Sequence, residues 1–212
     1  MRSKEIIGEG RNHPVIVVDV QPEYCGINDG EESTVCLDIV KFVTNQTGPV
    51  LFFVNAEGQG LSGDTVDGVR LYWDDTVREL TGDYENERPI NWARFQIVDK
   101  GYGYLRSWMD HGIEPSVIIS TIRELYQQRK SDSRELNFPP FNRRTPQQSL
   151  IMGAIEEMKD DPLTVNWTSV AQLKRFNGAY IVGGGRNECL REVELLMNAF
   201  NIRYRRIDSL VY

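Results

Sequence analysis

Three residues far apart in the sequence, Asp19, Lys100 and Cys189, have the side-chain types of a cysteine-nucleophile site. Cys189 follows a run of three glycines, residues 183–185, and falls in the first turn of a predicted helix. There the helix dipole and the outward-pointing N–H groups lower the pKa of a thiol and can stabilise an oxyanion. Asp19 would then take the thiol proton, and Lys100 would hold both negative charges in place.

Each of these residues also has a purely structural interpretation. A cysteine on the inner face of a helix is most often a small buried hydrophobe. Asp19 ends an apolar run, where an aspartate can also cap the following loop. Lys100 can be an ordinary surface lysine. The residue types alone therefore leave catalysis and structure open for all three positions.

The three residues lie where we predict parallel strands to end. Short, continuously apolar runs, which are typical of strands buried on both faces, cover residues 14–20, 50–54 and 179–182. A further strand is predicted over 93–98, and a last one over 202–210, at or near a sheet edge because it alternates with arginines. Helical spacing is found over residues 33–48, 69–80, 104–111, 113–130, 145–159 and 169–176, and again after Cys189.

Strands that alternate with helices predict an α/β fold, a three-layer, doubly wound, mostly parallel sheet of about five to six strands. In such Rossmann-like sheets, ligands bind in the crevice outside the carboxyl ends of the strands. This rule places Asp19, Asn55, Lys100 and the 183–189 turn at one edge of the sheet, although they come from distant parts of the sequence.

Two of the predicted strand ends resemble motifs of a known family. Residues 15–25, VIVVDVQPEYC, are similar to the opening strand of the isochorismatase-like cysteine hydrolases, a superfamily that includes the nicotinamidases. Residues 181–190, IVGGGRNECL, resemble the family's nucleophile turn, in which a glycine ends a strand and a cysteine follows six positions on. The resemblance implies an Asp–Lys–Cys catalytic triad, with Asp19 as the base, Cys189 as the nucleophile and Lys100 as the lysine.

The resemblance also implies a non-proline cis peptide at or near Gly184–Gly185, with the N–H groups of residues 185 and 189 as the oxyanion hole. The chain departs from the family pattern in three places. Arg186 stands where a small or hydroxylic residue is usual. Residues 113–168 exceed the usual connection, so we interpret them as a helical insertion within a single domain over 1–212. The metal-binding residues of nicotinamidases have no counterpart after the second strand, so no metal is expected.

Composition limits the function classes. The chain has 212 residues, a net charge of −7 and a pI of about 5.0, which disfavours nucleic-acid binding. No apolar run approaches the length of a membrane span, and residues 1–13 lack the apolar core of a secretory signal. Three cysteines without a CxxC motif indicate a reducing, cytoplasmic compartment. The chain has only two histidines, so a His-rich metal site is not expected.

Three functions remain to be weighed. The first is a metal-free cysteine hydrolase that needs no cofactor and acts on a small amide-like or related polar substrate. The expected substrate-binding residues are Gln21, Asn55, Gly184, Gly185 and Arg186. The second is a catalytically inactive isochorismatase-like fold used as a binding or assembly module, and association into homo-oligomers stays open. The third is nucleotide or phosphate binding at the glycine turn, although the glycines form neither G-x-G-x-x-G nor a P-loop.

Overall fold

The computed structural model describes residues 12–21, 25, 34–54, 66–87, 89–99, 108–128, 146, 149, 151 and 167–212. Its strands are β1 (Val15–Val18), β2 (Val50–Val54), β3 (Phe95–Asp99), β4 (Ala179–Gly183) and β5 (Tyr204–Arg206). Its α-helices are α1 (Thr34–Thr44), α2 (Val66–Thr81), α4 (Pro115–Gln128), α6 (Trp167–Arg175) and α7 (Cys189–Ala199). Two 3₁₀ turns are η2 (Trp92–Arg94) and η3 (Asp208–Leu210).

The five strands form one sheet in the order β3-β2-β1-β4-β5, and every neighbouring pair is parallel. Val18 of β1 lies opposite Phe53 of β2 on one side and Gly183 of β4 on the other. The chain moves outward from β1 to β3 and then returns to add β4 beside β1. The predicted α/β fold with a parallel sheet is thus confirmed, and β5 is an edge strand as expected.

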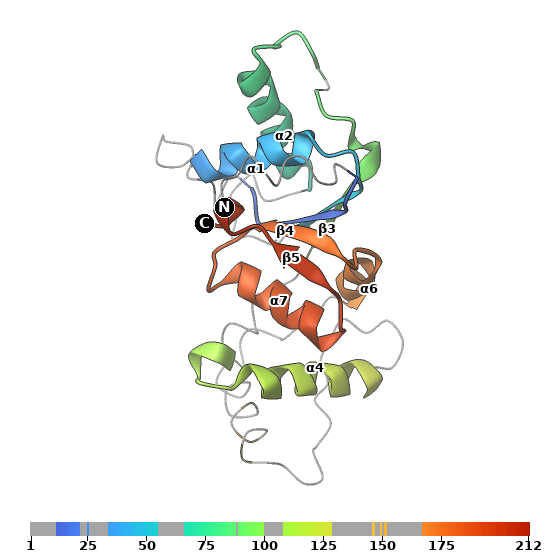
Figure 1. The fold of residues 1–212 in the computed structure, drawn as a ribbon, viewed down its shortest axis with the longest axis vertical. Coiled ribbons are helices and arrows are strands. Elements are labelled where there is room, and N and C mark those ends of the chain that lie inside the picture. Colours follow the sequence, from blue (N-terminus) through green and yellow to red (C-terminus); the bar gives the residue numbers. More distant parts are fainter. Residues whose placement is uncertain are drawn as a thin grey trace.

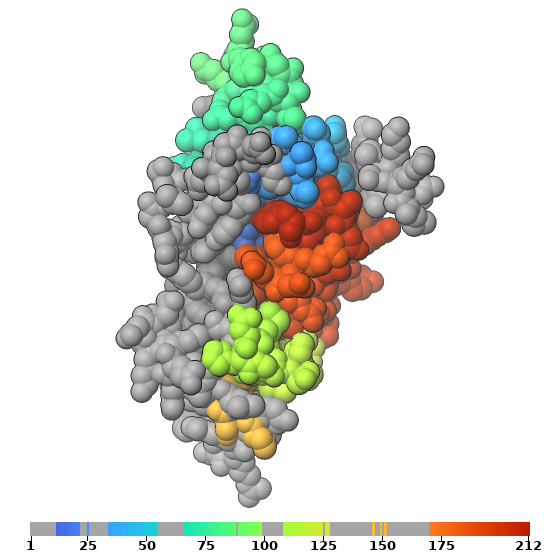
Figure 2. Space-filling view, turned by 90° about the vertical axis from the view of Figure 1, so that its left-hand side faces the viewer, coloured from blue at the N-terminus to red at the C-terminus, as the bar shows by residue number. Residues whose placement is uncertain are grey.

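Helices cover both faces of the sheet (Figure 1). Helices α1 and α2 lie on one face and α6 and α7 on the other, and α4 packs against α7 on the side away from the sheet. In Figure 2 the C-terminal residues, coloured orange to red, lie at the surface between α4 and the layer that contains α1 and α2. The order of strand, helix and strand along the chain therefore produces a layered molecule with an additional outer helix.

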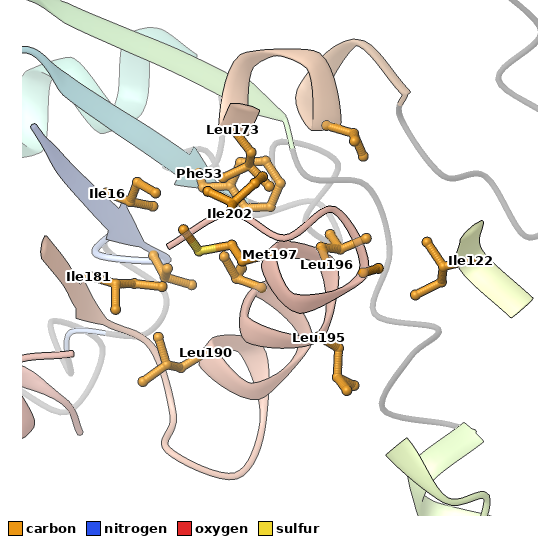
Figure 3. Packing of buried hydrophobic residues seen from close by; sticks show 14 of the residues in the cluster. Ile16, Phe53, Ile122, Leu173, Ile181, Leu190, Leu195, Leu196, Met197 and Ile202 are labelled. Atoms are coloured by element: carbon orange, nitrogen blue, oxygen red, sulfur yellow. The ribbon is translucent and has the colours of Figure 1, made fainter. Parts of the chain in front are cut away.

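Helix α7 is enclosed on two sides. Figure 3 shows Leu190 and Met197 on the side of the strand residue Ile181, whereas Leu195 lies on the opposite side of the helix. Asn198 is the one exposed residue of this helix. From α4, the guanidinium of Arg123 donates to the backbone oxygen of Ala199 at 2.6 Å and of Asn198 at 3.1 Å. A cation at these last carbonyls also interacts favourably with the helix dipole.

The continuous apolar runs are explained by a core on each face of the sheet. Along β1, Ile16 and Val18 join the hydrophobic cluster on the α7 side, whereas Val15 and Val17 join the cluster on the α1 and α2 side. Successive side chains of a strand point to opposite faces. A strand with a helix layer on both faces therefore needs apolar residues at every position.

Some predicted bounds differ from the structure. The strand predicted over 93–98 starts at Phe95, because the Asn91 side chain accepts from the Ala93 N–H and caps η2 first. The strand predicted over 202–210 ends at Arg206, and η3 follows. The helix predicted over 33–48 ends at Thr44. The predicted helices over 104–111 and 145–159 lie largely outside the described residues.

Candidate active site

Asp19 follows β1 directly and is fully buried. Its backbone is left-handed, with φ of 49°. Three hydrogen bonds hold this conformation: its N–H donates to the Phe53 oxygen at 3.2 Å, and its carbonyl accepts from the Gln21 N–H at 3.0 Å and from the Tyr212 hydroxyl at 2.7 Å. Aspartate tolerates this backbone region better than most residues, yet at some cost. Buried acidic groups in such conformations are frequent at functional sites.

The turn after β4 depends on two glycines with positive φ, Gly183 at 79° and Gly184 at 68°. A Cβ atom on Gly183 would lie 2.5 Å from the Val18 carbonyl oxygen and 2.6 Å from Val20 Cγ2. A Cβ atom on Gly184 would lie 3.1 Å from the Leu190 nitrogen. Glycine is therefore required both for the backbone angles and for the close approach of this turn to the end of β1.

Cys189 is the first residue of α7, as predicted. Its side chain is half-buried and packs against the hydrophobic cluster on the α7 side. The side chain of Glu188, the N-cap residue, makes no capping hydrogen bond. Cys189 forms no disulfide, and neither do the buried Cys25 and Cys36. A thiol in the first turn of a helix experiences the positive end of the dipole, which favours the thiolate form.

The nucleophile turn, residues 183–189, contains the Gly185 N–H, one of the two predicted oxyanion donors. Gly185 donates no hydrogen bond from its N–H to any described residue, although its carbonyl accepts from the N–H groups of Glu188 at 3.0 Å and Leu190 at 3.3 Å. The cis peptide implied by the resemblance at Gly184–Gly185 is not found. All peptide bonds of the described residues are trans, and the two positive-φ glycines shape the turn instead.

Tyr212 is a component of this region that the sequence did not reveal. Its hydroxyl donates to the Asp19 carbonyl, and its own carbonyl accepts from the Arg186 N–H at 3.0 Å. Burial raises the pKa of this phenol above its ordinary value, and the negative charges of four neighbours raise it further: Cys25, Asp19, Cys36 and Cys189. No motif marks this tyrosine, because its contacts join residues that are distant in sequence.

The predicted substrate-binding residues Gln21 and Arg186 occupy different environments. Gln21 is fully buried, and its carbonyl accepts from the Cys25 N–H at 3.1 Å. Arg186 is exposed and pairs with Asp208, 3.9 Å between Nη1 and Oδ1. Arg186 can therefore be a member of a surface ion pair instead of a substrate-binding residue. Exposed ion pairs of this length contribute little to stability.

Two predicted site residues, Lys100 and Asn55, lie outside the described residues. The strands that precede them, β3 and β2, are parallel neighbours with Val54 opposite Asp99. In the part of the chain that the structure describes, no group of three or more His, Cys, Asp or Glu side chains could hold a metal ion. No helix among the described residues is long and apolar enough to cross a membrane.

No protein-family model, curated protein or solved structure matches this chain. The resemblance to the isochorismatase-like hydrolases consequently rests on the sequence, chiefly on residues 15–25 and 181–190.

Proposed function

We propose that the chain is a metal-free cysteine hydrolase of the isochorismatase-like type, which acts on a small amide-like or related polar substrate. The observation that carries this proposal is the placement of Asp19 and Cys189 after β1 and β4. These strands are paired neighbours, and the strand order of the sheet reverses between them. In open α/β sheets, ligands bind at the carboxyl ends of the strands at this switch point.

In the proposed reaction, Sγ of Cys189 attacks the substrate carbonyl carbon while the Asp19 carboxylate takes the thiol proton. The carbonyl π electrons move to oxygen, and the Gly185 N–H donates to the resulting oxyanion. Collapse of this intermediate breaks the C–N bond, and the leaving amine takes the proton from Asp19. Water, deprotonated by Asp19, then attacks the thioester and releases the acid and the Cys189 thiol.

Lys100 is proposed to hold the two negative charges, as the family resemblance implies. Gln21, Asn55, Gly184, Gly185 and Arg186 are the proposed substrate contacts. Arg186 can exchange its exposed partner Asp208 for a carboxylate of the substrate, because an ion pair at the surface is weak. A cytoplasmic setting is proposed with this chemistry, since thiolate nucleophiles are preserved in a reducing compartment.

The experiment is alkylation of Cys189 by iodoacetamide across pH, with each cysteine followed by peptide mass spectrometry. The wild type is compared with D19N, and D38N is the matched control, because Asp38 is an exposed carboxylate on α1. We expect Cys189 to react with a midpoint below about 8.5, the value of a free thiol, and D19N to change this profile. D38N should match the wild type. Loss of the base should lower any amide hydrolysis about 100- to 10,000-fold.

The alternative is an inactive isochorismatase-like fold that serves as a binding or assembly module. It is favoured by the packing of Cys189 against the core cluster and by the ion pair of Arg186. If Cys189 reacts as slowly as the buried Cys25 and Cys36 at every pH, the hydrolase proposal is wrong and the binding module becomes the better one.

A further inference from the structure

We infer that Tyr212 is a positioning residue that fixes the end of β1 and the nucleophile turn relative to each other. The inference rests on the function proposed above, because it concerns how Asp19 and Cys189 are held. It assigns no proton transfer to Tyr212 itself.

One residue contacts both halves of the site. The Tyr212 hydroxyl donates to the carbonyl of Asp19, and the Tyr212 carbonyl accepts from the N–H of Arg186. Asp19 follows β1, whereas Arg186 lies within the turn between β4 and α7. Tyr212 thus forms a bridge of two hydrogen bonds between two segments. The same segments approach each other closely at the glycines of the nucleophile turn.

The bridge is itself anchored to the sheet. The Ile207 N–H donates to the Ile181 oxygen at 3.2 Å, and the Leu210 N–H donates to the Ile207 oxygen at 2.9 Å. The turn η3 that precedes Tyr212 also packs against α1 and β4. A bridge held at both the sheet and a helix can transmit rigidity to the residues that it contacts.

The hydrogen bond from the Tyr212 hydroxyl is made to the backbone of Asp19, which has an unfavourable conformation. The left-handed backbone of Asp19 is unfavourable for a non-glycine residue, and it sets the direction in which the carboxylate points away from the backbone. A phenol is a reliable donor as long as it stays protonated. Burial and the charges of Cys25, Asp19, Cys36 and Cys189 raise the pKa of Tyr212, which keeps the proton in place.

The test compares the pH profile of Cys189 alkylation in the wild type, Y212F and D19N. Y126F is the matched control, because the Tyr126 hydroxyl also takes part in a hydrogen bond, accepting from Lys174 Nζ at 3.0 Å between α4 and α6. Thermal unfolding checks that each variant is folded. We expect Y212F to change the rate about two- to tenfold, the range of a single hydrogen bond, and to move the midpoint in the same direction as D19N. Y126F should leave both unchanged.

Failure of the inference and failure of the proposed function give different results. If D19N alters the profile and Y212F matches the wild type, the positioning role is wrong and the hydrolase proposal stands. If Y212F and Y126F alter it equally, the effect is general and the positioning role is again wrong. If D19N has no effect, the proposed function is wrong, and any effect of Y212F does not pass through Asp19, which overturns the inference as well.

A second measurement applies if Y212F does not fold. In the wild type, hydrogen exchange of the Arg186 amide is compared with that of Asn187, an exposed neighbour whose N–H donates to no described residue. The bridge predicts that the Arg186 amide exchanges at least about tenfold more slowly, since its N–H is bonded to the Tyr212 carbonyl. Equal rates would show that the bridge is not maintained in solution.

Discussion

Both ends of β4 carry a glycine with positive φ, but the surroundings of the two glycines differ. Gly178 precedes the strand with φ of 86°, and Gly183 ends it with φ of 79°. A Cβ atom on Gly178 would meet nothing within 4 Å, whereas one on Gly183 would lie 2.5 Å from the Val18 carbonyl oxygen. Glycine at the amino end therefore serves the turn alone. Glycine at the carboxyl end also lets two strands approach each other, and the candidate site lies at that approach.

The segments that meet at these two ends differ in the same way. At the amino end, the Gly178 N–H donates to the Arg203 carbonyl and the Arg203 N–H donates to the Asn177 side chain, so two exposed segments meet. At the carboxyl end, the residues after β1, the nucleophile turn and Tyr212 come from three distant parts of the sequence. The carboxyl end thus brings together chemical groups from three segments, and the candidate site lies there.

The largest expected effect separates the two glycines. G178A should lower the free energy of unfolding by about 1–2 kcal/mol, the cost of a left-handed L-residue. G183A should lower it by about 2–5 kcal/mol, because overpacking of about 1–3 kcal/mol is added to that strain. Urea unfolding of both variants measures the difference. Equal losses would show that the close contact with Val18 is relieved at little cost, and the comparison would fail.

A smaller effect concerns alkaline pH, because the carboxyl end holds a partly buried phenol. Tyr212 has a raised pKa in the folded state and an ordinary value of about 10 when unfolded. Above pH 10 the unfolded chain therefore binds fewer protons than the folded one, so stability is full below pH 10 and falls as pH rises. By pH 11 the loss from this group is on the order of 1 kcal/mol.

The same comparison with Y212F isolates this group, because the variant has no proton to lose at this position. Its free energy of unfolding should fall less steeply between pH 9 and 11 than that of the wild type, with other tyrosines such as Tyr204 contributing equally to both. Parallel slopes would mean that the Tyr212 hydroxyl is accessible to water in the folded protein.

The smallest effect is expected at the exposed part of the carboxyl end. R186A removes the pair with Asp208, and both side chains are more than half exposed, at 53% and 61%. The free energy of unfolding should change by no more than about 0.5 kcal/mol. Alkylation of Cys189 by the uncharged iodoacetamide should match the wild type. A loss above about 1 kcal/mol would assign Arg186 a structural role and weaken its proposed role in substrate binding.

The pattern of apolar residues predicted the sheet well, because burial on two faces leaves few other residues in a strand. The runs at 50–54 and 179–182 coincide with β2 and β4 almost to the residue. The end of β5 was less predictable. Alternation continues past Arg206, yet the Ile207 N–H donates to the Ile181 oxygen and the chain then enters η3. That change depends on a tertiary contact, which local periodicity does not encode.

The candidate site was likewise only partly predictable from the sequence. The rule for strand ends predicts Asp19 and Cys189 at one edge of the sheet from the sequence alone. The left-handed backbone of Asp19 was not predictable, because the apolar run continues to Val20 as though the strand did. Tyr212 was not predictable either, since the bond from its hydroxyl to Asp19 spans 193 positions.

Helix α7, which begins at Cys189, is enclosed by the sheet and by α4. A helix that is packed on one face can tilt or slide by disturbing one interface, but α7 would have to disturb two, and Arg123 would have to release its last carbonyls. Local opening of proteins starts where few buried apolar contacts hold a segment. The body of α7 is therefore one of the better supported segments among the described residues, and it carries Cys189 as its first residue.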